Sequence, residues 1–277
     1  MGKVGLLPKA GLIPLAAGRI AYRLRSPWLQ FRRGIARRIA SVEPGFFDAY
    51  PRFYSTSYAQ ARPNRLNRRY EVMIAANAGL IRGQSVLDIA SHDGRWSLAA
   101  QKTGAREVLG IEARAHLVNA ARESLRMYQV PAGAVRFIQG DIFEQLDQLE
   151  PARFDTVFCF GFFYHTMHHM LLLNKIARLK PNYLICDTEI DLDPDAIVKV
   201  HAEGVEKEYA GAFSDAGAEG AILVGHPSQP ALELMLKHAG FDCRFLDWRS
   251  FGIRRWDGLK EYHDGSRVTL VAKRKGS

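Results

Sequence analysis

The stretch Val86–Trp96 limits the fold of this chain more than any other part of its sequence. It reads VLDIASHDGRW: an apolar run that contains one acid, followed by a turn of small and polar residues. The run predicts a buried strand, and Gly94 allows the backbone to pass close to a ligand before a helix begins. A strand, a tight turn and a helix in this order are typical of the first unit of a doubly wound α/β sheet, where ligands bind.

The rest of the chain after Ser85 continues this alternation of strands and helices. Apolar runs predict strands over residues 86–90, 108–112, 135–139, 154–160, 183–187, 241–246 and 267–273. Amphipathic patterns predict helices over residues 95–102, 115–128, 143–149, 168–179 and 229–239. Right-handed crossovers then give an α/β, Rossmann-like sandwich of three layers with a seven-stranded sheet.

We expect three regions along the chain. Residues 1–42 form a basic N-terminal arm, residues 43–82 a connector that ends in a helix over 65–81, and residues 83–277 the main domain. The connector is rich in aromatic residues and is either a lid on the ligand pocket or a segment packed on the domain. Residues 188–226 are too long for an ordinary loop, so we expect an inserted active-site segment with a helix over 195–209.

The positive charge of the chain comes from the arm. It holds nine of the 38 basic residues and no acid, so the remainder is balanced at 29 against 29. Apolar residues recur at helical spacing over residues 19–40, with arginines on the other face. This pattern predicts a helix that lies on an anionic membrane or on RNA, or that packs on the main domain; an organelle transit peptide is a further alternative.

The cysteines and the apolar stretches bear on the compartment. Three isolated cysteines without metal-ligand spacing favour reduced core residues. The apolar stretch near the N-terminus is too short and too interrupted to span a bilayer. We therefore expect a cytoplasmic protein, peripheral to a membrane if the arm binds one.

Acids stand at the ends of successive predicted strands: Asp88, Glu112, Asp141 and Asp155. This series resembles the class I S-adenosylmethionine-dependent methyltransferases, which implies a methyltransferase sandwich, here with an N-terminal helical extension. The resemblance implies that Glu112 accepts hydrogen bonds from both ribose hydroxyls of S-adenosylmethionine and that Asp141 binds the adenine amino group. Asp88 would fix the first turn or contact the methionine part.

The first turn departs from the usual pattern of that family, acid-x-Gly-x-Gly-x-Gly. Ala90 and His92 replace two of the glycines, and Gly94 keeps the third. His92 is expected to point out of the turn, toward the methionine carboxylate or into solvent. The pattern G-x-G-x-x-G of NAD-binding turns is absent, which argues against a dehydrogenase. Further cofactor contacts are expected from Ile142 after the third strand, from Phe160 at the end of the fourth strand and from Gly161 after it.

The acceptor side of the site is expected after the fourth strand. Tyr164 and His165 follow it, and His165 is the first candidate for the base that takes a proton from a hydroxyl nucleophile. Capping of the next helix, or a hydrogen bond to a backbone group, is the structural alternative for His165. His168 and His169 are rival bases, and Glu189 or Asp191 after the fifth strand could orient the base or bind a metal. No metal cluster is predicted.

Two segments resemble a narrower family, the tRNA wobble-uridine carboxymethyltransferases and their relatives. They are Asp155–His165 and His226–Phe241. Three functions follow from the sequence. The first is O-methylation of a small molecule, a sugar or a lipid-linked glycan; the second is modification of a tRNA uridine with a methyl or carboxymethyl group. The third is a cofactor-binding module without transfer activity.

Overall fold

The computed structural model describes residues 44–56, 61–204 and 221–277. The predicted arm over residues 1–42 lies outside this part of the chain. So does the second part of the helix predicted over residues 195–209, from residue 205 onward.

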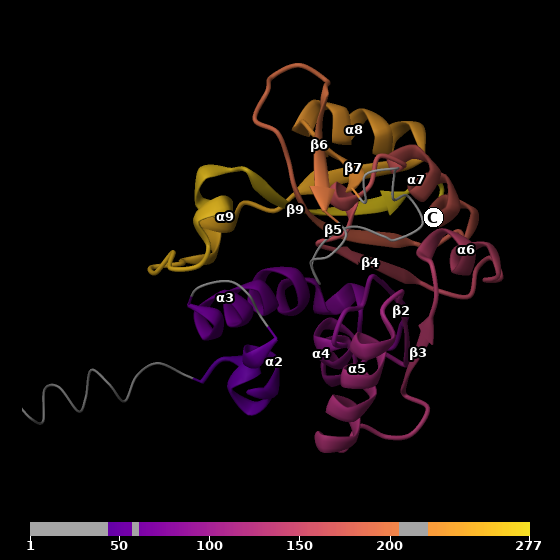
Figure 1. Cartoon of the computed structure of the whole chain (residues 1–277), viewed down its shortest axis with the longest axis vertical. Coiled ribbons are helices and arrows are strands. Elements are labelled where there is room, and N and C mark those ends of the chain that lie inside the picture. Colours follow the sequence, from indigo (N-terminus) through magenta and orange to yellow (C-terminus); the bar gives the residue numbers. More distant parts are fainter. Residues whose placement is uncertain (1–43, 57–60, 205–220) are drawn as a thin grey trace, which may run out of the picture. The chain divides into compact units, whose positions relative to one another are not determined.

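A seven-stranded sheet forms the centre of the domain, with the strand order β3-β2-β1-β4-β5-β9-β8 (Figure 1). Strands β1 to β5 run parallel, and β9 runs antiparallel to both of its neighbours. The strands are β1 (Ser85–Ile89), β2 (Glu107–Glu112), β3 (Val135–Gln139), β4 (Thr156–Phe160), β5 (Tyr183–Glu189), β8 (Phe241–Phe245) and β9 (Arg267–Arg274). The predicted seven-stranded α/β sandwich is confirmed.

Helices cover both faces of the sheet and make three layers. Successive side chains of a strand point to opposite faces. Val86 therefore packs into one core cluster with Trp96 and Val118, whereas Leu87 packs into the other with Leu172. The helices of the first layer are α4 (Arg95–Thr103) and α5 (Ala115–Met127); those of the second are α6 (Ile142–Asp147), α7 (His169–Arg178) and α8 (Gln229–His238).

The segment before β1 is helical and packs on the first layer. It comprises η1 (Phe46–Ala49), α2 (Arg52–Ser55), α3 (Arg62–Arg69), η2 (Tyr70–Ile74) and η3 (Ala75–Leu80). The last three cover the helix predicted over residues 65–81, which continues from α-helical through π-helical to 3-10 geometry. Phe47 is fully buried, and its ring meets that of Trp96 edge-on at 5.5 Å.

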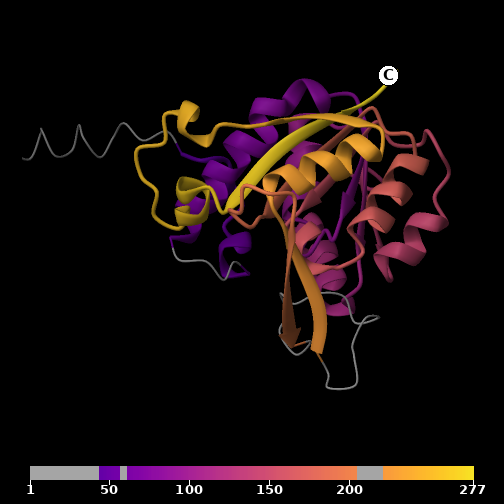
Figure 2. The same ribbon diagram turned by 90° about the horizontal axis from the view of Figure 1, so that it is seen from above.

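A separate two-stranded ribbon lies between β5 and α8 in the chain. It pairs β6 (Val198–Gly204) with β7 (Ala221–Pro227) antiparallel. Figure 2 shows the ribbon extending away from the seven-stranded sheet. The helix predicted over residues 195–209 is wrong for residues 198–204, because VKVHAEG alternates with a period of two, which suits a strand.

Three short elements complete the described part of the chain: η4 (Phe163–His165), η6 (Trp248–Phe251) and α9 (Lys260–Asp264). None of the described helices combines the length with the apolar surface needed to cross a bilayer.

Candidate active site

The turn after β1 contains three residues in the left-handed backbone region. Their φ angles are 53° at Ala90, 52° at His92 and 78° at Gly94. A Cβ atom at Gly94 would lie 2.7 Å from Cζ of Phe137, so glycine is required there for space as well as for conformation. Ala90 and His92 thus adopt the backbone geometry that glycines adopt readily, at some cost in strain.

The side chains of the turn bind one another. Nε of Arg95 donates to Oδ1 of Asp93 at 2.7 Å, and Nη2 donates to Oδ2 at 2.9 Å. Burial alone would raise the pKa of Asp93, but the Arg95 guanidinium lowers it below its usual range. Nδ1 of His92 lies 3.2 Å from Nη2 of Arg95. The expectation that His92 points out of the turn is therefore wrong for this ring nitrogen, which faces back to the ion pair.

Glu112 connects the end of β2 to this turn. Its side chain is almost fully buried; one carboxylate oxygen accepts from the backbone N–H of His92 at 3.0 Å, and the other accepts from that of Arg114 at 3.0 Å. Each carboxylate oxygen has two acceptor sites, so both retain capacity for a ligand hydroxyl. Glu112 is thus held with both oxygens at the carboxyl ends of β1 and β2.

Asp141 and Asp88 occupy the neighbouring strand ends. Oδ1 of Asp141 accepts from the backbone N–H of Phe143 at 2.8 Å, so Asp141 caps α6, whose first residue is Ile142. Asp88 is buried beneath the turn, where Oγ of Ser97 donates to it at 2.6 Å, and burial raises its pKa to about 7. Asp88 therefore connects α4 to β1.

These residues fit S-adenosylmethionine. Three residues of the turn have left-handed backbone conformations at the carboxyl end of β1. Glu112 ends β2, and Asp141 follows the adjacent strand β3. Oγ of Ser91 is buried and has no hydrogen-bond partner among the described residues.

The segment after β4 carries the predicted acceptor side. Phe160 ends the strand, and Gly161 follows with φ of 76° and donates its N–H to the Asp187 carbonyl at 2.8 Å. The next residues form η4 with Tyr164 and His165. Nδ1 of His165 lies 2.9 Å from Oε2 of Glu203 on β6. The sequence analysis missed Glu203, although the alternation in β6 was a signal for its strand.

Tyr164 lies among aromatic and charged groups. Its ring centroid is 4.1 Å from that of His165 and 5.4 Å from that of His226, which in turn is 4.7 Å from that of His201. The guanidinium of Arg267 lies 5.4 Å from the Tyr164 ring. Burial raises the pKa of Tyr164, so its hydroxyl keeps its proton at neutral pH.

A buried charged cluster lies at the end of β5, and sequence reasoning did not predict it. Asp187 is fully buried and accepts from Arg267 at 2.7 Å and from Arg69 at 2.9 Å. Tyr262 and Thr269 donate to the same carboxylate. Burial alone would raise the pKa of Asp187, but the two guanidinium groups lower it to about 2.

The remaining candidates have structural partners. Glu189 accepts from Nη1 of Arg267 at 3.0 Å, and Asp191 pairs with Lys199 at 3.2 Å. Nε2 of His169 lies 3.0 Å from the Gly225 carbonyl, and burial lowers the pKa of its imidazole, so His169 has a structural role. His168 precedes α7 as its N-cap residue. Within the described ranges, no three His, Cys, Asp or Glu side chains gather as metal ligands do.

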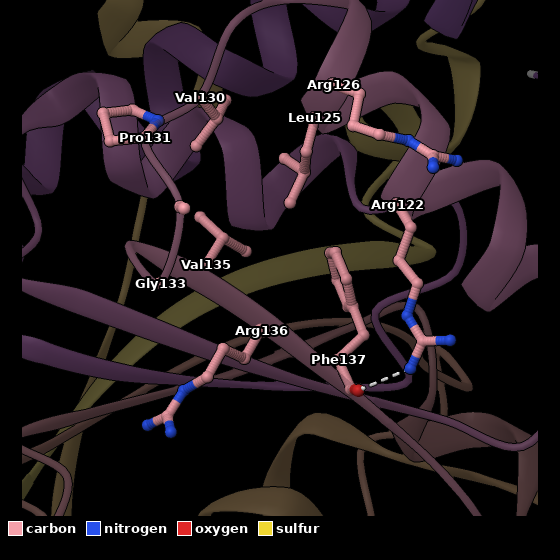
Figure 3. Close-up of a pocket in the computed structure, with 10 residues that line it drawn as sticks. Arg122, Leu125, Arg126, Val130, Pro131, Gly133, Val135, Arg136 and Phe137 are labelled. Atoms are coloured by element: carbon pink, nitrogen blue, oxygen red, sulfur yellow. Dashed lines mark hydrogen bonds between the residues drawn. The ribbon is translucent and has the colours of Figure 1, made fainter.

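A cavity of about 570 Å³ lies elsewhere, between α5, the following loop and β3 (Figure 3). Leu125, Val130, Val135 and Phe137 form its apolar wall, with Arg122 beside them. None of the predicted site residues lines it. Phe137 nevertheless connects it to the turn, because this ring also packs against Gly94.

Comparisons with known proteins bear on the domain and its fold. Residues 86–182 match the family model described as a methyltransferase domain. No curated protein matches the chain.

Solved structures with a similar fold include methyltransferases. The N-terminal domain of EvdMO1 with SAH bound is 18% identical, with a TM-score of 0.56, over 88% of this chain and 97% of that one. The magnesium protoporphyrin IX methyltransferase from Synechocystis PCC 6803 with bound SAH is 17% identical, with a TM-score of 0.54, over 83% and 94%. An S-adenosylmethionine-dependent methyltransferase from Mesorhizobium loti is 15% identical, with a TM-score of 0.52, over 76% and 100%.

At these identities the solved structures show the fold, whereas the family match covers the segment from β1 to the loop before β5, which holds the turn, Glu112, Asp141 and His165. Residues 86–182 therefore match a methyltransferase domain, and the described part of the chain has the fold of the class I S-adenosylmethionine-dependent methyltransferases.

Proposed function

We propose that this enzyme transfers a methyl group to a hydroxyl oxygen of a small molecule, a sugar or a lipid-linked glycan. The position of His165 carries the proposal. Its imidazole follows β4, at the same edge of the parallel strands as Glu112 and Asp141, and its side chain is 13% exposed. A hydroxyl must lose its proton to become a nucleophile, and imidazole is the side chain best suited to take that proton near neutral pH.

The cofactor site in this proposal consists of the predicted residues. The carboxylate of Glu112 accepts from the ribose hydroxyls, and Asp141 and Ile142 bind the adenine. The turn, with Asp88 beneath it, supports the rest of the cofactor together with the residues that follow β4. The turn residues are Ala90, His92 and Gly94; Phe160 ends β4 and Gly161 follows it. When bound, S-adenosylmethionine supplies an electrophilic methyl group on a sulfonium.

His165 and Tyr164 act on the acceptor. The bound cofactor would supply the methyl group to the acceptor oxygen, and its sulfur would keep the electron pair of the carbon–sulfur bond. The hydroxyl proton passes to Nε2 of His165 and from there to solvent. Tyr164 keeps its proton, because burial raises its pKa, so it can donate a hydrogen bond to the acceptor but is a poor base. Glu189 orients Arg267 beside Tyr164.

Two observations support a polar acceptor. The side chains near His165 are hydrogen-bonding groups from η4 and the ribbon, among them Tyr164, His201 and His226. The N-terminal domain of EvdMO1, 19% identical with a TM-score of 0.55, was crystallised in the presence of SAH and D-fucose. Residues 19–40, if they bind an anionic membrane, would bring the enzyme to a lipid-linked acceptor.

The test is a methyl-transfer assay on the full chain with tritium-labelled S-adenosylmethionine. The acceptors are D-fucose, a nucleotide-linked deoxysugar, a lipid-linked glycan extract and bulk tRNA. We expect label in a sugar or glycan fraction. His165→Asn should lower the turnover by roughly 10²- to 10⁴-fold, as loss of a general base does. His238→Asn, an exposed position on α8, is the matched control.

Each other outcome points to a different function. Label in tRNA would mean that tRNA is the acceptor, as the resemblance to tRNA-modifying enzymes implies. The transfer rate should then fall steeply as the salt concentration rises. Binding of the cofactor without label in any fraction would indicate the non-catalytic module. Full turnover in His165→Asn would exclude His165 as the base.

A further inference from the structure

Nδ1 of His165 has a carboxylate partner on the two-stranded ribbon, outside the seven-stranded sheet. Glu203 lies near the end of β6, and Oε2 of Glu203 is 2.9 Å from Nδ1 of His165. Both side chains are shielded, with exposed fractions of 13% for His165 and 28% for Glu203. Among the described residues, Nε2 of His165 has no hydrogen-bond partner, so the two ring nitrogens differ in their surroundings.

The ribbon places Glu203 on the face that meets η4. Glu203 pairs with Ile222 and Lys199 pairs with His226 across the ribbon, and alternate residues of a strand share a face. Lys199, His201, Glu203 and His226 therefore lie on one face. The rings of His226 and Tyr164 meet edge-on at 5.4 Å, so this face is the one beside η4.

We infer that Glu203 is a positioning residue for methyl transfer: its carboxylate holds the proton of His165 on Nδ1 and leaves Nε2 as the atom that takes the proton of the acceptor. The inference rests on the proposed function of His165. A neutral imidazole carries one proton, and a carboxylate can only accept, so the pair fixes the tautomer. The ring of Tyr164, 4.1 Å from that of His165, limits its rotation.

The same carboxylate also acts during the transfer. When Nε2 takes the hydroxyl proton, the imidazole becomes a cation, and the Glu203 carboxylate beside Nδ1 stabilises it. The proton then leaves from Nε2 to solvent, which restores the neutral ring. Glu203 contacts neither the acceptor nor the methyl group and acts through His165. Because Glu203 belongs to the ribbon, the ribbon is part of the catalytic centre.

The first test needs no acceptor. Full-length protein labelled with ¹⁵N-histidine is compared by NMR as wild type, Glu203→Gln and Glu233→Gln; the signals of His165 are those that His165→Asn removes. We expect the Nδ1–H tautomer in the wild type. In Glu203→Gln the amide N–H can donate to Nδ1, so the Nε2–H tautomer should increase. Glu233 is an exposed carboxylate on α8 and its variant should leave His165 unchanged.

The second test uses the acceptor that the labelling assay identifies. Glu203→Gln should lower kcat by roughly 10²-fold and change KM by less than about threefold, and adding it to His165→Asn should cause little further loss. A tautomer that is the same in the wild type and in Glu203→Gln would overturn the inference even if transfer is found. Conversely, a tautomer change without any transfer would retain the role of Glu203 toward His165 and reject the proposed function.

Discussion

Two buried aspartates at the carboxyl ends of strands have opposite pKa shifts, and the difference lies in their partners. Asp88 on β1 accepts a hydrogen bond from the neutral hydroxyl of Ser97, and burial raises the pKa of Asp88 to about 7. Asp187 on β5 is equally buried, but the guanidinium groups of Arg267 and Arg69 lower its pKa to about 2. Burial disfavours the charged form unless an opposite charge compensates for it. The position of an acid at the end of a strand therefore does not determine whether it is ionised at neutral pH.

Asp88 makes the stability of the domain depend on pH in a predictable direction. Its pKa in the folded state, about 7, lies above the usual value of 3.8, so between these values the folded state binds more protons than the unfolded state. The stabilising contribution of Asp88 is complete below the usual value and is lost as pH rises through about 7. The slope reaches at most about 1.4 kcal/mol per pH unit.

Asp88→Asn should remove this dependence, because the amide does not titrate and its oxygen can still accept from Ser97. The measurement is urea denaturation of both proteins from about pH 4 to about pH 8, a range that brackets the shift. We expect the free energy of unfolding of the variant to rise relative to the wild type across that range. A constant difference would mean that Asp88 does not titrate there.

At the scale of elements, the Asp187 cluster joins four parts of the chain. Asp187 belongs to β5, Arg267 and Thr269 to β9, Arg69 to α3 and Tyr262 to α9. Asp187→Asn would leave two buried guanidinium groups with less compensating charge. Because breaking a buried ion pair at one partner is strongly destabilising, we expect a loss of about 3–5 kcal/mol.

The control for this cluster is Asp257→Asn. Asp257 pairs with Arg255 on the surface, with exposed fractions of 59% and 74%, and surface pairs of this kind contribute about 1 kcal/mol or less. Chemical denaturation of both variants checks the difference. Equal losses would mean that the buried cluster adds nothing beyond a surface pair.

How far the sequence predicts the structure also depends on the scale of the element. The seven strands follow from local apolar runs, and Asp88, Glu112 and Asp141 follow from the strands. Asp155 does not belong to that edge: it precedes β4 and accepts from Ser85 at the start of β1. The ribbon was missed although VKVHAEG alternates, because the length of residues 188–226 indicated an inserted segment but not its secondary structure. The Asp187 cluster could not be found, because Arg69 and Arg267 are separated from Asp187 by 118 and 80 residues.

For the molecule as a whole, cofactor binding should act on stability through the turn and the sheet together. Glu112 accepts from the N–H of His92 in the turn and from that of Arg114 after β2, so a ligand bound to its carboxylate connects both segments. A ligand that binds only the folded state stabilises it by about 2.7 kcal/mol when the free ligand concentration is roughly 100 times the Kd. S-adenosylmethionine or its demethylated product should therefore raise the Tm of the wild type by several degrees, and NAD should not.

Glu112→Gln tests that the carboxylate, and not merely the fold, holds the cofactor. The amide retains one acceptor oxygen but places an N–H group where the ribose hydroxyls would donate, so we expect the Kd to rise by roughly 10- to 100-fold, or about 1.4–2.8 kcal/mol. Glu107→Gln is the matched control, since Glu107 begins the same strand and pairs with Arg136 at the surface. Isothermal titration calorimetry measures both. Unchanged affinity in Glu112→Gln, with normal folding, would place the cofactor away from the end of β2. A loss confined to Glu112→Gln would establish the cofactor site at the turn that the sequence first indicated.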